Sequence, residues 1–323
     1  MHGFKTFTLS AAALAMTAGS ASAIQIQIDA DLDRWNYPFN LTPGIRDKAP
    51  TFGAVGSPVF DNRDGQLLLG FDLAGLLPAL GPGQSYQINA ATVTATHSTG
   101  AFQYDPTYDG YQTYLDSNDP NFVADGDAGR PIVLTGTGFR SGFFALGFGG
   151  GFPPPAAGPP TYEEDDVFAF ADPTLPGVRN AFASASAGAG LVDISNNVDD
   201  AFDFTPFAVG QTNLNPGDAA LEGVAGVSAG STFSFDLNLS DPVVLGYLQQ
   251  QLAFNQLGFT ISSLHGTSQA GGSNPNFYTR DDFDPAAISP SLFLDIEVVP
   301  EPASAALLLA GGVAAFARRR RAS

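Results

Sequence analysis

Residues 231–240 read Ser-Thr-Phe-Ser-Phe-Asp-Leu-Asn-Leu-Ser, a stretch in which apolar and polar side chains alternate. The apolar positions are Phe233, Phe235, Leu237 and Leu239. Successive side chains of a β-strand point to opposite faces of its sheet, so a period of two places these four residues on one face. The stretch therefore predicts a half-buried strand.

The same period recurs along the chain. Alternating segments lie at residues 24–28, 66–73, 85–98, 257–261 and 292–298, and turns rich in Gly, Pro, Asn and Asp separate them. Many short strands joined by such turns are typical of an all-β protein. The sequence predicts one antiparallel β-sandwich or barrel over residues 24–298.

Two segments depart from the strand pattern. Asp241 and Pro242 suit the N-cap and first position of a helix, and apolar residues then recur at helical spacing. We expect a short amphipathic helix from Pro242 to about Ala253, packed across one end of the sandwich.

Residues 149–160 are Gly, Pro and Ala apart from Phe152. We interpret them as a loop inserted into one domain; the alternative is a linker between two domains.

Composition limits what the body of the protein can be. Residues 24–302 hold eight basic residues against 32 acidic ones and carry a net charge of −24. Such a surface repels phosphate backbones, which argues against nucleic-acid binding. The chain has no cysteine, so disulfides, zinc–thiolate sites and cysteine nucleophiles are excluded. Its 27 phenylalanines indicate that burial, rather than covalent cross-links, stabilises the fold.

The amino-terminal segment is typical of a secretory signal peptide. Residues 1–23 carry Lys5, an apolar run at residues 11–16 and small residues ending in Ala21-Ser22-Ala23. A positive start, an apolar middle and an Ala-x-Ala end predict export and cleavage after Ala23.

The carboxyl end combines three blocks. Pro300, Glu301 and Pro302 precede the uncharged residues 303–317, and Arg318, Arg319, Arg320 and Arg321 follow. A helix of this apolar length reaches ~22 Å, short of a ~30 Å hydrocarbon core, which suits transient insertion. The positive-inside rule keeps the arginines in the cytoplasm and the acidic body outside.

In this order, the three blocks resemble the PEP-CTERM sorting signal over residues 299–323. The resemblance implies recognition by an exosortase, a membrane transpeptidase-like protease that removes the tail near Pro-Glu-Pro. It also implies a Gram-negative source that makes extracellular polysaccharide. The expected partners are the export machinery and the exosortase. The expected route leads from an inner-membrane intermediate, anchored by a transmembrane helix at residues 303–317, to the cell surface or medium.

The body offers one weak pattern for hydrolytic catalysis. Gly226-Val227-Ser228-Ala229-Gly230 fits Gly-x-Ser-x-Gly, and Asp241 and His265 follow it. A nucleophile elbow requires a strand that runs straight into a helix at the serine. Here the serine lies in a run of small residues and a predicted strand follows, so we assign no catalytic residue. The two carboxylates that catalyse glycoside hydrolysis are defined by their distance in the folded protein, not by their spacing in the sequence. A polysaccharide lyase or hydrolase therefore stays open as an alternative.

Alternating acids suggest two weak calcium candidates. The first comprises Asp29, Asp31 and Asp33, and the second comprises Asp125 and Asp127. Neither completes an EF-hand loop, and solvated turns are the simpler interpretation. The same caution applies to His97, which ends a predicted strand, and to His265, which follows another; neither belongs to a metal-binding motif.

Aromatic residues offer candidate contacts for carbohydrate. Four of the nine tyrosines (Tyr104, Tyr108, Tyr111 and Tyr114) fall within residues 104–114, and Trp35 with Tyr37 forms a second group. Exposed rings beside polar groups suit sugars, whose C–H faces are apolar and whose hydroxyls need partners. The alternative is that these rings cap the open end of the core.

A further resemblance concerns the body. Residues 68–73 (Leu-Leu-Gly-Phe-Asp-Leu), 88–95, 192–195, 277–281 and 290–295 resemble short motifs of DNRLRE-type domains, although the Pro-rich insert, Thr279 and Asp281 depart from that pattern. The resemblance implies a jelly-roll sandwich, and some of those domains bind polysaccharide. We therefore expect a non-catalytic surface or extracellular-matrix protein, as in a biofilm, that contacts exopolysaccharide. The alternatives are a polysaccharide-active enzyme and a self-associating structural surface protein.

Overall fold

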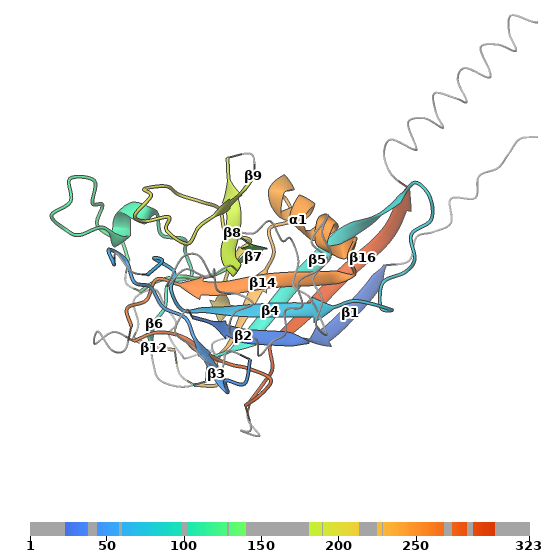
Figure 1. Ribbon diagram of the computed structural model, residues 1–323, viewed down its shortest axis with the longest axis horizontal. Helices are drawn as coiled ribbons and strands as arrows, with labels where there is room; N and C mark the ends of the chain where they lie inside the picture. Colours follow the sequence, from blue (N-terminus) through green and yellow to red (C-terminus); the bar gives the residue numbers. More distant parts are fainter. Residues whose placement is uncertain are drawn as a thin grey trace, which may run out of the picture.

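The predicted strands pair into two antiparallel sheets that face each other (Figure 1). The computed structural model describes residues 23–37, 44–57, 60–98, 102–127, 129–139, 181–188, 190–212, 225–227, 229–267, 273–282 and 287–300. Residues 1–22 of the predicted signal peptide, including Ala21, the Pro-rich segment 149–160 and the tail beyond Pro300 lie outside the described residues.

Within the described ranges, the first sheet has five strands in the order β1-β16-β5-β13-β11. The period-two segments at residues 24–28, 85–98 and 292–298 all belong to it. Asn89 and Asp295 join the two central strands on its outer face at 3.0 Å. Its strands are β1 (Ile24–Asp29), β5 (Gln84–Thr96), β11 (Gln211–Thr212), β13 (Thr232–Asp236) and β16 (Ser291–Pro300).

The second sheet follows the order β2-β4-β14-β7-β8-β9, and β10 also pairs with β7. Two short ribbons, β6–β12 and β3–β15, extend one end of the sandwich. The bounds are β2 (Leu32–Asn36), β3 (Lys48–Pro50), β4 (Gln66–Asp72), β6 (Phe102–Gln103), β7 (Ile132–Phe139), β8 (Ala181–Ala187), β9 (Gly190–Asp193), β10 (Ala208–Val209), β12 (Ala225–Val227), β14 (Gln256–Ser263) and β15 (Asn276–Tyr278).

The strand order of the sandwich is that of a jelly roll. In chain order its eight principal strands are β1, β4, β5, β7, β10, β13, β14 and β16. If these strands are numbered 1 to 8 along the chain, their order in the first sheet is 1-8-3-6 and their order in the second sheet is 2-7-4-5. Two Greek keys produce this arrangement. The prediction of an all-β sandwich is confirmed.

One main core fills the space between the sheets. Phe233 and Phe235 of β13 are fully buried there, against side chains from β4 and β14. The second sheet is also buried on its other face, where Thr137 and Thr260 pair their hydroxyls at 2.8 Å. These two buried hydroxyls are therefore hydrogen-bonded to each other, as is usual for polar groups in a low-dielectric interior.

The predicted helix is present as α1 (Pro242–Leu252), capped by the Asp241 side chain, which accepts from Val243 N at 2.8 Å. It packs against β14 and β8 and buries Val244 and Leu248. The strand before it is shorter than residues 231–240, because β13 ends at Asp236 and the chain then turns into the cap.

Candidate functional site

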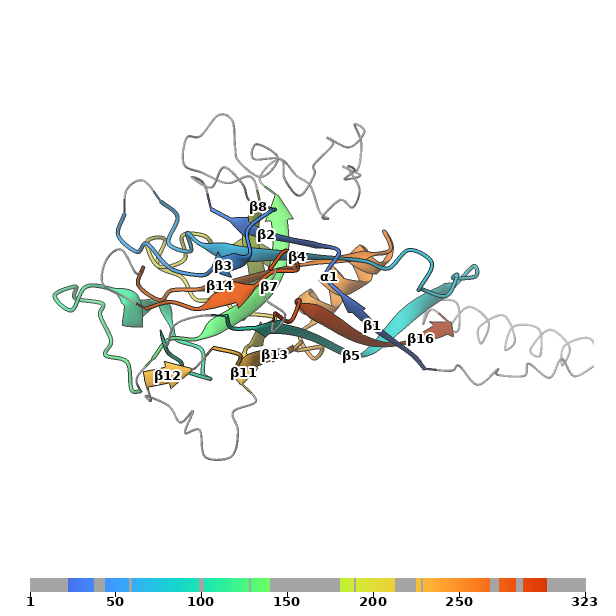
Figure 2. The same ribbon diagram turned by 90° about the horizontal axis from the view of Figure 1, so that it is seen from below.

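An open cleft of about 1370 Å³ lies at one end of the sandwich. Its lining comes from the end of β2, the loop after β3, the short 3-10 helix η1 (Tyr111–Tyr114), the chain from η1 towards β7, and the chain from the end of β14 to the start of β15. Figures 1 and 2 show η1 and β3 at the end of the sandwich away from the start of β1 and the end of β16. Long connections crowd that end and build the cleft.

Trp35 and Tyr37 form an aromatic platform in the cleft. They are two residues apart on an extended segment, so their side chains share a face. Their rings stack with centroids 4.8 Å apart and an interplanar angle of 18°. Trp35 Nε1 donates to the Pro50 carbonyl at 2.8 Å, and the Phe52 ring lies 5.6 Å from Tyr37. The platform is therefore held by packing and by a hydrogen bond to β3.

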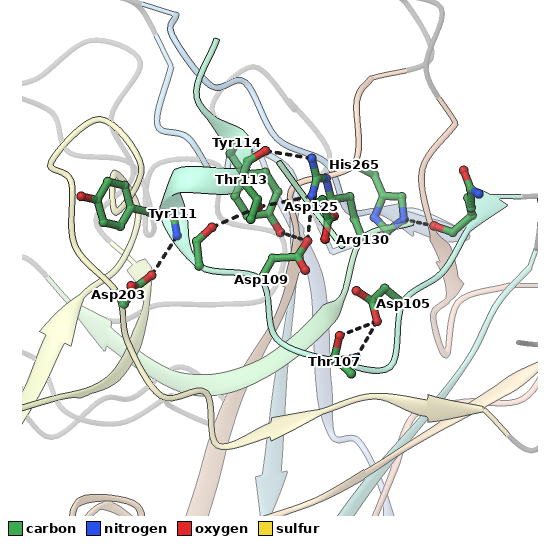
Figure 3. Close-up of polar contacts among 12 residues, drawn as sticks. Asp105, Thr107, Asp109, Tyr111, Thr113, Tyr114, Asp125, Arg130, Asp203 and His265 are labelled. Carbon is green, nitrogen blue, oxygen red and sulfur yellow. Dashed lines mark hydrogen bonds and ion pairs between the residues drawn. The ribbon is translucent and has the colours of Figure 1, made fainter. Parts of the chain in front are cut away.

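The same cleft contains Tyr114 and Arg130. Arg130 Cζ lies 4.3 Å from the Tyr114 centroid, and its Nη1 contacts Asp109 Oδ2 at 2.8 Å and Asp125 Oδ2 at 2.6 Å. Tyr114 also donates its hydroxyl to Asp109 at 3.1 Å (Figure 3). One guanidinium thus links η1 to the chain that leads into β7.

The other tyrosines of residues 104–114 do not join this surface. Tyr104 is buried, donates its hydroxyl to the Gly210 carbonyl and packs on Phe233 with centroids 5.2 Å apart. Tyr108 packs edge-on against Phe204. Tyr111 points away from Arg130 (Figure 3). The expected single group of four rings is thus divided. Tyr104 caps the core, and Tyr114 joins Trp35 and Tyr37, which had been expected as a separate site.

Four aspartates meet beneath the Arg130 side of the cleft. Asp105, Asp109, Asp125 and Asp127 each offer a carboxylate oxygen, and these oxygens lie within 4.8 Å of one another. Burial raises the pKa of the Asp109 carboxyl to about 6; Arg130 opposes the shift, and Asp125 and Asp105 add to it. The negative charge of the four carboxylates therefore exceeds the positive charge of Arg130.

The acids expected as the other calcium candidate are dispersed. Asp33 is buried and accepts from the Arg280 backbone N at 2.6 Å. Asp31 accepts from the Asp72 backbone N at 2.6 Å, and Asp29 is exposed at the end of β1. Within the described ranges, the metal-compatible group of acids contains Asp125 and Asp127 but none of these three.

The weak hydrolase pattern does not lie between a strand and a helix. Ser228 lies outside the described residues, and the chain runs from β12 into β13, another strand, rather than into a helix. Asp241 caps α1, and His265 Nε2 bonds the Gln103 carbonyl at 2.8 Å. Burial lowers the pKa of His265 to about 4. His97 is also buried, and its Nδ1 accepts from Asn276 N at 3.2 Å.

Sequence reasoning missed three contributors to this region: Arg130, Asp105 and Asp109. A usable signal was present, since Asp105-x-x-x-Asp109 and Asp125-x-Asp127 flank the same excursion between β6 and β7. Chemically, the cleft combines stacked rings with carboxylate, guanidinium and carboxamide groups, and its volume exceeds the roughly 300–1,000 Å³ usual for small-molecule sites.

Comparison with known proteins adds little for the body. Among curated proteins, none matches the chain. Among solved structures, the unassembled KI polyomavirus VP1 pentamer is similar, with 12% identity and a TM-score of 0.26 over 85% of this chain and 94% of that chain. A similarity this distant adds nothing to the strand order given above.

The tail is identified more firmly. Within the described residues, no helix is long and apolar enough to cross a bilayer, and residues 303–317 lie outside them. Residues 298–321 match the family described as the PEP-CTERM protein-sorting motif. The chain therefore carries a PEP-CTERM sorting signal, which implies export and delivery to the surface or medium through an exosortase.

Proposed function

We propose that this is a non-catalytic surface or matrix protein whose cleft contacts exopolysaccharide. The sorting motif accounts for its delivery, with removal of the tail near Pro300-Glu301-Pro302. The function of the body rests on one observation, the stacked pair of Trp35 and Tyr37 in an open cleft that also contains Tyr114.

Three features favour a sugar polymer as the ligand. The aromatic platform offers ring surface to the C–H faces of sugars, and Arg46 Cζ, 5.4 Å from the Trp35 centroid, covers part of it. Asn274, Asn276 and Asp64 supply amide and carboxylate groups along the same cleft. The open form and large volume suit a segment of chain better than a single small molecule. The resemblance to DNRLRE-type domains, some of which bind polysaccharide, agrees with this proposal.

Affinity electrophoresis through gels that contain exopolysaccharide purified from the producing bacterium tests the proposal. We expect the wild-type protein to be retarded. We expect Tyr37→Ala to weaken binding by about 2–10-fold, the equivalent of one lost aromatic contact of about 0.5–1.5 kcal/mol. Tyr111→Ala is the matched control, because Tyr111 has the same chemistry and points away from the Tyr114–Arg130 side of the cleft (Figure 3).

Three outcomes would contradict the proposal. Equal retardation of the wild type and Tyr37→Ala would remove the platform as the contact. Loss of polymer viscosity with new chain ends in the presence of the wild-type protein would favour the enzyme alternative. No retardation, together with concentration-dependent assembly in sedimentation, would favour the self-associating alternative.

A further inference from the structure

The four aspartates below the cleft come from two legs of one excursion. Asp105 and Asp109 follow β6, and Asp125 and Asp127 precede β7. The legs are joined where Asp105 N donates to the Arg130 carbonyl at 3.2 Å. Carboxylates 16 or more positions apart in sequence are thus brought within 4.8 Å of one another.

The described contacts leave this cluster undercompensated. Arg130 contacts one oxygen each of Asp109 and Asp125, and Thr107 donates through both its N and Oγ1 to Asp105 Oδ1 at 2.7 Å. Asp105 is fully buried, and its Oδ2 has no hydrogen-bond partner. Figure 3 shows the Asp105 carboxylate facing Asp109, with Thr107 bound to one of its oxygens. An unpartnered buried carboxylate oxygen is costly, so its position demands a cation or a donor.

We propose that Asp105, Asp109, Asp125 and Asp127 bind one hard divalent cation of the Ca²⁺ class. All the donors are oxygens, which favours Ca²⁺ over metals that prefer imidazole or thiolate. Two oxygens on opposite sides of Ca²⁺ lie about 4.6–5.2 Å apart, twice the Ca–O distance, whereas Mg²⁺ requires about 4.0–4.2 Å. A set confined within 4.8 Å therefore already fits a Ca²⁺ coordination sphere.

The ion would join both legs of the excursion directly beneath the cleft. Asp109 holds the Tyr114 hydroxyl, and Asp125 holds Arg130, so two of its ligands also position cleft residues. Calcium would stabilise this wall whether or not a sugar binds, so the inference does not depend on the proposed function.

Isothermal titration calorimetry of the full chain, stripped with EDTA and dialysed into 150 mM KCl, tests the site with CaCl₂ and then with MgCl₂. We expect saturable binding of one Ca²⁺ per chain, weaker binding of Mg²⁺ and a calcium-dependent rise in Tm. Asp105→Asn should weaken Ca²⁺ binding by about tenfold or more, since it removes a charged ligand. Asp116→Asn is the control. It removes the same charge from an exposed position between the two legs, outside the cluster.

A second variant covers the case in which Asp105→Asn fails to fold. Asp127 is half-buried rather than fully buried, so Asp127→Asn should fold and still weaken binding relative to Asp116→Asn. The proposal would be overturned if the wild-type protein shows no saturable Ca²⁺ heat and no Tm shift. Equal Ca²⁺ affinity in the wild type and Asp127→Asn, or equal loss in Asp116→Asn, would also overturn it.

Discussion

The guanidinium of Arg130 covers the Tyr114 ring at 4.3 Å and, from the same side chain, pairs with Asp109 and Asp125. Arginine suits this position because its planar group stacks on a ring and still donates in its own plane. One residue therefore fixes an aromatic face of the cleft and neutralises part of the acidic cluster below it.

Arg130→Met should destabilise the fold. The Asp109 side chain is 4% exposed, so removing Arg130 leaves a buried carboxylate without its cation. Arg130 itself is 26% exposed, which lowers the expected cost from the full value for buried pairs to about 2 kcal/mol. Urea unfolding of the wild type and Arg130→Met at pH 8 with EDTA measures this loss in the free energy of unfolding.

Lys48→Met is the comparison for Arg130→Met. The Lys48 ion pair with Asp282 spans 4.0 Å, and its side chains are 33% and 7% exposed, so it differs from the Arg130 contacts in distance rather than in the burial of its carboxylate. Its loss should cost less than about 1 kcal/mol, because the contact is long and single. If both variants lose the same stability, the short contacts of Arg130 with Asp109 and Asp125 do not have the effect assigned to them.

His265→Gln should make stability less sensitive to acid. Burial lowers the folded-state pKa of His265 to about 4, below the unfolded value of 6.5. The unfolded chain therefore binds the proton first, and the wild-type protein loses stability as the pH falls from about 7 to about 4. The difference in pKa corresponds to about 3 kcal/mol.

The measurement compares the free energies of unfolding of wild type and His265→Gln in EDTA across that pH window. Glutamine can still donate to the Gln103 carbonyl, which His265 contacts now. Other acids, including Asp109, titrate in both proteins, so the difference isolates the histidine. Parallel pH profiles for the two proteins would show that His265 is not held neutral by burial.

Tyr247→Phe should cost about 1–3 kcal/mol, because it removes a buried hydroxyl from backbone partners. That hydroxyl donates to the Gly258 carbonyl at 2.5 Å and accepts from Thr137 N at 3.1 Å, which ties α1 to β7 and β14. Tyr111→Phe, at a half-buried ring, should change stability by less than about 0.5 kcal/mol. Thermal unfolding of both variants checks this, and similar Tm losses would contradict it.

Intact mass spectrometry of the protein from cells and from medium tests the processing of both ends. The expected mass outside the cells spans residue 24 to about Pro302. Replacing Arg318, Arg319, Arg320 and Arg321 by alanine should leave the tail attached, because the sorting signal loses its basic block. A released protein that still contains residues 303–323 in the wild type would exclude tail removal.

Local patterns were sufficient for the helix and for six strands (β1, β4, β5, β13, β14 and β16), but not for β2, β7 or β8. Alternation around Phe259 predicts β14, and Asp241-Pro242 predicts the start of α1, because both depend on near neighbours in sequence. The site depends on distant neighbours. The Tyr104 hydroxyl is taken by a carbonyl at Gly210, and Tyr114 shares a cleft with Trp35. Spacing along the chain contains no information on either contact. The sequence could therefore identify the aromatic residues as candidates, but it could not predict which of them lie in the core and which line the cleft.

The placement of β16 has a mechanical consequence. This strand lies between β1 and β5, and its ladder with β5 continues to Pro300, opposite Gln84. The sorting motif begins at residue 298, inside that ladder. A pull on the tail therefore acts along a central strand, and the hydrogen bonds of two flanking ladders resist it together in shear. An edge strand would instead peel away one pair at a time, so the fold is joined to its tail where it best withstands tension.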